Sequence, residues 1–158
     1  IIGVGDEAVS SDRSNTLTTY ALGSCIAVVV YDAGRGVGGL LHFMLPEASL
    51  SPEKAKAQPA MFVDTGLPLL LDNFARIGGS PSRSKVLLAG GASVLTGKDI
   101  FRIGERNYHA VVSNLKLFGL KAHCVHVGGY SNRTVHLDLG TGKTTVKLPA
   151  ETKEYDLA

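Results

Sequence analysis

The chain has 158 residues, 44% of them hydrophobic and 19% charged, which suits one domain, residues 1–158, with a core of its own. Its 16 lysines and arginines against 14 acidic residues give a net charge of +2 without any basic cluster, which argues against a nucleic-acid surface. No apolar run approaches the roughly 20 residues that a membrane-spanning helix needs. Only two cysteines occur, Cys25 and Cys124, so we expect free thiols in a soluble, cytoplasmic protein that is not inserted in a membrane.

The first third of the chain is typical of β structure. Thr16–Leu22 is rich in Thr and Leu, Ile26–Tyr31 is mostly β-branched, and Val37–Phe43 is again apolar. The residues between the last two segments, 32–36, are typical of a turn. Two strands with so short a connection predict an antiparallel hairpin.

The rest of the chain mixes helices and strands. Residues 46–59 contain three prolines and predict an irregular loop, which could act as a flap over a site. Apolar residues at three- and four-residue steps predict helices over 63–77 and 108–118, each ended by glycine. Further strands are expected at 85–89, 121–127, 134–139 and 143–148. This order predicts an α+β fold, a mixed but largely antiparallel β-sandwich flanked by helices.

The hairpin brings a cysteine and a histidine together. If its centre lies between Ala33 and Gly34, opposite residues have numbers that sum to 67, which pairs Cys25 with His42. Residues opposite each other project from the same face, with Cβ atoms about 4.5–5.5 Å apart. A slip of one residue would place the two side chains on opposite faces.

The pair suits a thiol hydrolase. A charged His42 would lower the pKa of the Cys25 thiol, and the same imidazole could protonate a leaving group and then activate water. Gly23 and Ser24 would let the backbone turn before the nucleophile, so that the Cys25 N–H could bind a developing oxyanion. Taken singly, each residue is more often structural, because free cysteines and strand histidines are commonly buried in cores.

Other motifs carry less chemistry. Residues 93–99 and 142–144 resemble phosphate-binding loops, but the first lacks the leading glycine and the magnesium-binding hydroxyl, and the second joins two strands. His123, Cys124 and His126 could suggest metal ligands, with His136 as a third same-face ligand beside Cys124 and His126. In a strand, however, His123 and Cys124 point to opposite faces. We therefore predict no metal site.

Several motifs occur in order along nearly the whole chain, and the most specific is an LGSC segment followed by HxMLP. The motif segments are residues 19–28, 42–46, 62–65, 89–93, 103–107, 128–129 and 141–143. Together they resemble the CheD family of bacterial chemotaxis proteins.

The resemblance implies a chemoreceptor glutamine deamidase, which hydrolyses glutamine side chains on methyl-accepting chemotaxis receptors to glutamate and ammonia without a cofactor. The family's nucleophile falls on Cys25, its histidine on His42 and its third member on Thr19. Its fold is the αβ sandwich shared with the catalytic domains of cytotoxic necrotizing factor toxins. The alternative function is that of an adaptor, which binds and modulates a CheC-type phosphatase of phosphorylated CheY. Hydrolysis of a small amide is a third possibility, which would require a deep pocket.

Overall fold

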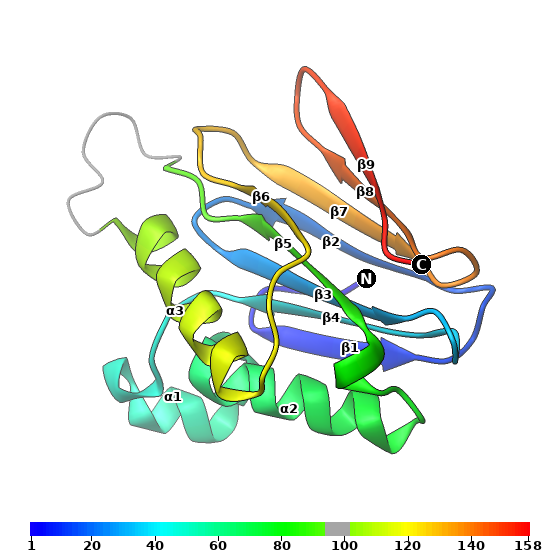
Figure 1. Ribbon diagram of the computed structural model, residues 1–158. Coiled ribbons are helices and arrows are strands. Elements are labelled where there is room, and N and C mark those ends of the chain that lie inside the picture. The colour runs from blue at the N-terminus through cyan, green and yellow to red at the C-terminus, as the bar shows by residue number, and fades with distance from the viewer. Residues whose placement is uncertain (94–101) are drawn as a thin grey trace.

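The computed structural model describes residues 1–93 and 102–158. It contains two stacked β-sheets with helices on one outer face (Figure 1). The five-stranded sheet has the order β1-β4-β3-β5-β6, and the four-stranded sheet has the order β2-β7-β8-β9. The strands are β1 Asp6–Ser10, β2 Thr16–Leu22, β3 Ile26–Asp32, β4 Val37–Phe43, β5 Lys85–Gly90, β6 Cys124–Val127, β7 Arg133–Asp138, β8 Lys143–Lys147 and β9 Thr152–Asp156.

Among the described residues, every strand pairing is antiparallel except that of β5 with β6, which confirms the predicted α+β sandwich of mixed, largely antiparallel sheets. The hairpin of β3 and β4 is also confirmed, but its register is not the predicted one. Asp32 pairs with Val37 and Ala27 with His42, so opposite numbers sum to 69 rather than 67. The turn is centred one residue later than expected, and Gly36 ends it with a φ of +65°, a conformation that glycine adopts readily.

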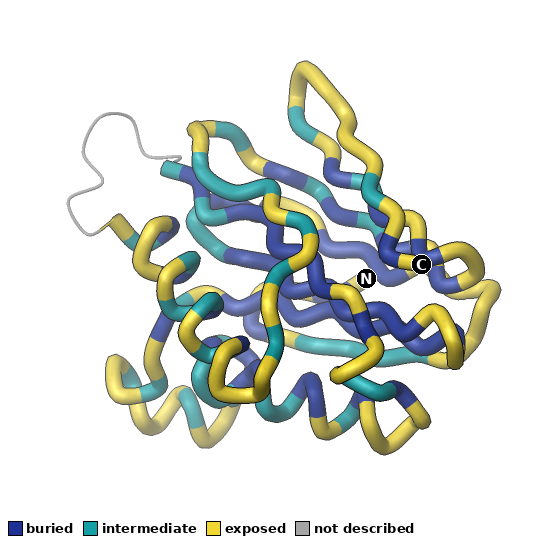
Figure 2. The backbone as a smooth tube through the Cα atoms, viewed as in Figure 1, coloured by how far each residue is buried: buried dark blue, intermediate teal, exposed yellow. Residues whose placement is uncertain are grey.

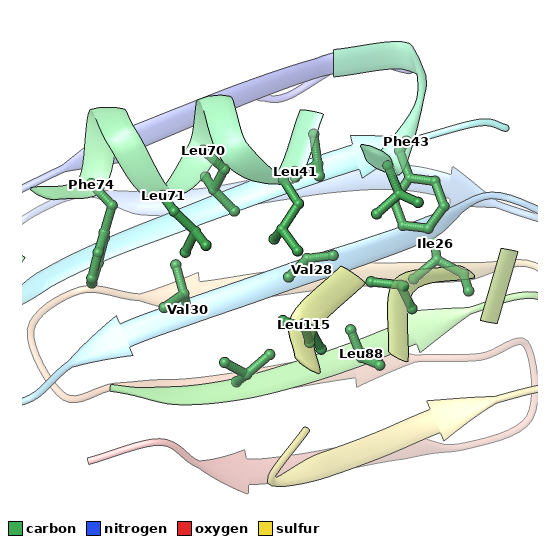
Figure 3. Close-up of a cluster of buried hydrophobic side chains, with 14 of the residues drawn as sticks. Ile26, Val28, Val30, Leu41, Phe43, Leu70, Leu71, Phe74, Leu88 and Leu115 are labelled. Atoms are coloured by element: carbon green, nitrogen blue, oxygen red, sulfur yellow. The ribbon is translucent and has the colours of Figure 1, made fainter. Parts of the chain in front are cut away.

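The helices cover the outer face of the five-stranded sheet. They are α1 Pro52–Ala57, α2 Val63–Arg76 and α3 Ile103–Leu117. Alternate residues of β3, among them Ile26, Val28 and Val30, form one buried cluster with Leu70 and Phe74 of α2 (Figure 3). The period of two in the strand and of three to four in the helix thus brings both apolar faces into one core.

A second core lies between the two sheets. The intervening residues of β3, Ala27, Val29 and Tyr31, point away from the helices and pack with Leu40 of β4 and Leu137 of β7. Both faces of β3 are therefore covered, and the strand is buried along its whole length (Figure 2). Odd-numbered residues of β3 and even-numbered residues of β4 consequently face the four-stranded sheet.

The structure also differs from the prediction outside the hairpin. Residues 46–59 are not an irregular loop, because Pro52 occupies the first turn of α1, where a proline without its N–H is tolerated. β1 and β9 were not expected, since both are short edge strands. Of the loop-like motif at 93–99, residues 94–99 lie outside the described part of the chain. Among the helices that are described, none has the length and apolar character needed to cross a membrane.

Candidate active site

His42 lies near the end of β4 and points into the space between the two sheets. Its side chain is fully buried. Its Nδ1 atom lies 2.7 Å from the hydroxyl oxygen of Thr19 in β2, so one strand of each sheet contributes to this pair. The structure thus brings together two of the three residues that the resemblance implies for the site.

The hydroxyl of Thr19 determines which nitrogen of His42 carries the proton. Thr19 Oγ1 donates its hydrogen to the carbonyl oxygen of Ile2, at 2.7 Å. Because that hydrogen is committed, the oxygen accepts from His42, and Nδ1 is the protonated nitrogen. The Nε2 atom is then unprotonated and carries a free lone pair. It is buried without a hydrogen-bond partner among residues 1–93 and 102–158.

Cys25 lies in the bend that precedes β3, half-buried against the apolar residues between the sheets. The prediction that it stands opposite His42 is wrong, because Ala27 occupies that position. The difference is two residues, an even number, so Cys25 remains a diagonal neighbour of His42 on the same sheet face. Diagonal positions are about 7–8 Å apart, which long and aromatic side chains can bridge. No hydrogen bond links the thiol to Nε2 in the described residues.

The bend that carries the nucleophile candidate is held at three consecutive carbonyl oxygens. These belong to Gly23, Ser24 and Cys25, and their donors lie directly after β5 and on α3. The bonds are Ala92 N–H to Gly23, the Asn107 amide to Ser24 and Gly91 N–H to Cys25, at 2.9, 3.0 and 2.8 Å. The backbone of the bend is therefore fixed in one orientation.

The chain bends at Gly23 and Ser24, as predicted, and Ala21 at the end of β2 adds an irregularity that was not predicted. Ala21 has a φ of +58°, in the left-handed region that costs a non-glycine residue about 1–2 kcal/mol. It lies within an irregularity of the β2–β7 ladder between Thr19 and Leu22. Such bulges redirect the chain near functional sites, and here the bulge leads from the Thr19 position into the bend.

Glycines stand at the end of β5 and directly after it because the chain passes close to the bend there. A side chain at Gly90 would collide with the backbone carbonyl of Cys25, and its φ of +117° is also unfavourable for other residues. The neighbouring Gly91 packs closely against Gly104 at the start of α3. Glycine at these positions lets β5 and α3 approach the bend closely enough to bind its carbonyls.

Burial shifts the pKa values of the two candidate groups in opposite directions. It lowers the pKa of His42 to about 4 and raises the pKa of the Cys25 thiol, whose own backbone N–H has a smaller, lowering effect. Both groups are then neutral near pH 7. The expectation that a charged His42 lowers the thiol pKa is therefore wrong for the resting site.

The buried, neutral His42 also makes stability depend on pH. Its pKa is near 6.5 in an unfolded chain and about 4 in the fold, so the unfolded state binds more protons between these values. Stability is therefore lost as the pH falls from 6.5 to 4, and the shift corresponds to roughly 3 kcal/mol. We expect the unfolding free energy of the wild type to drop by about that much more than that of His42→Asn between pH 7 and pH 4.

Urea denaturation at several pH values measures this difference. The comparison with His42→Asn cancels the titration of other groups, such as His126 and His136, whose pKa values burial also lowers. Parallel curves for the two proteins would contradict the assignment of a depressed pKa to His42.

The remaining histidines have other partners. His123 Nδ1 accepts from the Val86 N–H, and His126 Nδ1 accepts from the guanidinium of Arg133. His136 Nδ1 lies 2.8 Å from the Thr18 hydroxyl, on the opposite face of β2 from the Thr19–His42 pair. Among the described residues, no group of three potential ligands could hold a metal ion.

Sequence reasoning missed two buried polar residues beside the bend. Arg133 faces Leu22 across β2 and β7 and donates to the carbonyls of Gly90 and Gly128, which ties the two sheets together. Asn107 is fully buried on α3 and donates to Ser24. The only signal for Asn107 was its place in the motif at 103–107, and nothing in the residue pattern indicated the role of Arg133.

A cleft of about 320 Å³ opens beside the bend. It lies between the N-terminal turn of α3 and the β6–β7 connection, and it includes Gly91, whose N–H binds the Cys25 carbonyl. Its wall carries the exposed ring of Tyr130. The lining residues are Gly91, Ser93, Gly104, Glu105, Tyr108, Val127, Gly128, Gly129 and Tyr130.

Comparison with known proteins identifies the family. The family model described as CheD chemotactic sensory transduction matches residues 44–148. A probable chemoreceptor glutamine deamidase CheD 1 of Syntrophus aciditrophicus is 44% identical over 150 residues, which cover 93% of this chain and 92% of the relative.

Two further relatives carry the name probable chemoreceptor glutamine deamidase CheD. The protein of Solibacter usitatus is 38% identical over 98% of this chain and 91% of its own length. The protein of Pyrococcus abyssi is 40% identical over 92% of this chain and 89% of its own length. The matches span both sheets, the bend at Cys25 and the helices that cover the core, so the chain belongs to the CheD family.

Proposed function

We propose that residues 1–158 form one deamidase domain, which converts glutamine side chains of methyl-accepting chemotaxis receptors to glutamate and ammonia. The names of the relatives support the reaction and the substrate. The observation that carries the mechanism is the buried His42, whose Nδ1 is bonded to Thr19 and whose Nε2 is left unprotonated on the sheet face that Cys25 shares.

The first half of the reaction forms a thioester. The Cys25 sulfur attacks the carboxamide carbon while its proton passes to His42 Nε2, so the neutral pair becomes charged only as the S–C bond forms. The resulting imidazolium gives this proton to the nitrogen as the C–N bond breaks, and ammonia leaves. The low pKa of His42 makes its imidazolium a strong acid for the protonation of the leaving nitrogen.

The second half regenerates the thiol. Nε2 takes a proton from a water molecule, which attacks the thioester carbon, and the C–S bond breaks as the proton returns to the sulfur. Thr19 keeps Nδ1 protonated and the ring in place throughout. A hydroxyl contributes no full charge to stabilise the imidazolium, unlike the carboxylate of a serine-protease triad.

The receptor segment enters by the cleft next to the bend. The cleft reaches Gly91, which contacts the Cys25 backbone, and it is lined by the exposed Tyr130 and by Tyr108 and Glu105 of α3. An open cleft suits a glutamine presented on a protein surface.

The raised thiol pKa predicts how Cys25 reacts with an alkylating reagent. With iodoacetamide, the alkylation rate of Cys25 should rise about tenfold per pH unit from pH 6 to pH 8, because burial raises the pKa of the thiol and the reactive thiolate is a small fraction over this range. Mass spectrometry of a Cys124→Ala variant isolates the signal of Cys25. A rate that levels off below pH 7 would instead mean that a charged His42 stabilises the thiolate.

A CheC-type phosphatase is a second proposed partner, which would dock at the same cleft and compete with the receptor segment. Slow reaction of Cys25 with iodoacetamide would not distinguish this adaptor function from the deamidase. A buried, neutral thiol reacts slowly in a resting deamidase as well. Competition decides the matter. Added phosphatase should inhibit receptor deamidation if the two partners share the cleft.

The function is tested with a purified cytoplasmic receptor fragment, by mass spectrometry of each glutamine before and after incubation with this protein. We expect conversion to glutamate at a few glutamines, accompanied by an equal amount of ammonia. Conversion at none of them in receptors from the same organism would refute the deamidase function and leave the adaptor.

A further inference from the structure

Asn107 links the two segments that carry Cys25 and His42. Its side-chain NH₂ donates to the carbonyl oxygen of Ser24 at 3.0 Å and to that of Met44 at 2.9 Å. Ser24 directly precedes Cys25, and Met44 follows His42 by two residues. One amide on α3 thus uses both of its N–H donors to clamp the bend to the end of β4.

This clamp carries an energetic cost. Asn107 is fully buried, and its Oδ1 has no hydrogen-bond partner among the described residues. An unsatisfied buried oxygen costs about 1–3 kcal/mol, and Asn107 bears this cost while its two N–H groups serve the carbonyls of Ser24 and Met44. The cost points to a function for the two donated bonds beyond filling the core.

The bond to Ser24 fixes the direction of the Cys25 amide. The Ser24 C=O and the Cys25 N–H belong to one planar trans peptide, so they point in opposite directions. When Asn107 holds the carbonyl toward α3, the N–H is turned away from α3. It lies on the side of its own Sγ, where it lowers the pKa of the thiol. This is the side on which the oxygen of a thiol-bound intermediate would develop its charge.

We infer that Asn107 is a positioning residue, which sets the Ser24–Cys25 peptide so that the Cys25 N–H stabilises the oxyanion. The inference deepens the proposed function and depends on it. Without the clamp the peptide can rotate, and its carbonyl oxygen would then repel the oxyanion that the N–H should bind. Removal of one oxyanion donor costs about 10²–10³-fold in kcat in other hydrolases.

Two variants test the inference. Asn107→Asp keeps the shape but replaces the donor by an acceptor, and Asn107→Ala removes both the donor and the unpaired oxygen. For deamidation of the receptor fragment, we expect kcat to fall about 10²-fold in each variant. We expect KM to change by no more than about twofold, because the contact acts in the transition state. Asn114→Asp is the matched control, since Asn114 lies on the same helix and, within the described part of the chain, its side chain donates to the Ala110 carbonyl in its own turn.

A second readout separates positioning from general damage to the fold. Alkylation of Cys25 by iodoacetamide forms no oxyanion, so its rate should stay within about threefold of the wild-type value in both variants. All proteins are assayed at a temperature at which circular dichroism shows them folded. If Asn107→Asp does not fold, the kcat and alkylation rate of Asn107→Ala alone test the inference.

Several results would overturn the inference. One is a kcat that is unchanged in the variants of an active wild type, which would leave the deamidase function intact. Another is an equal loss of deamidation and alkylation, which would reduce Asn107 to a structural residue. A wild type that converts no glutamine would remove the proposed function and this inference together.

Discussion

Replacing Cys25 by alanine is expected to abolish the conversion of receptor glutamine to glutamate. The variant loses the only atom that can form the thioester, and loss of a nucleophile costs on the order of 10⁴-fold or more in related mechanisms. Because the side chain is half-buried at the edge of the core, the fold should survive the change. Mass spectrometry of the receptor fragment gives the rate, and thermal unfolding checks the fold.

Cys124→Ala is the matched control for this prediction. Cys124 is also half-buried against the core between the sheets, but it lies on β6, outside the bend. Its removal should cost a similar amount of stability and no activity. Equal rates for Cys25→Ala and the wild type would end the enzymatic proposal.

His42→Asn should lower the deamidation rate on the order of 10²- to 10⁴-fold. The asparagine amide can still donate to Thr19 at the position of Nδ1, but it offers no base where Nε2 was. Thr19→Val should have a smaller effect, because Nε2 remains and only the acceptor that holds the ring and its tautomer is lost. The order of the three rates therefore reports the separate roles of base and orienting hydroxyl.

The chain contains a second threonine–histidine pair that serves as the control. His136 bonds to Thr18 at 2.8 Å on the opposite face of β2, away from Cys25. His136→Asn should therefore leave the rate unchanged. A loss of activity in His136→Asn equal to that in His42→Asn would show that the assay follows stability rather than catalysis.

The central strands and helices were predictable from sequence because their side chains are buried in a regular pattern. β2, β3 and β4 begin where the prediction placed them, and α2 follows the apolar spacing from Val63 onward. β1 and β9 were missed because they are edge strands held by the backbone of one neighbour, with few buried side chains to mark them.

The candidate site was predictable only in part. Cys25 and His42 stay on the same face of the sheet if the pairing of β3 with β4 shifts by an even number of residues. The predicted pairing was wrong by two residues, so the prediction of a common face still held. The pKa values depend on burial, which a register argument does not contain. Asn107 lies more than 60 residues along the chain from the carbonyls that it binds, and no local sequence pattern predicts such a contact.

Trapping the covalent intermediate tests the central claim most directly. The receptor fragment is incubated with the wild-type protein in the presence of hydroxylamine, which attacks thioesters, and each glutamine position is examined by mass spectrometry. Attack by the Cys25 sulfur predicts hydroxamate and glutamate at the same positions, with neither product formed by Cys25→Ala. Glutamate without any hydroxamate, or the same products from Cys25→Ala, would contradict a thioester on Cys25.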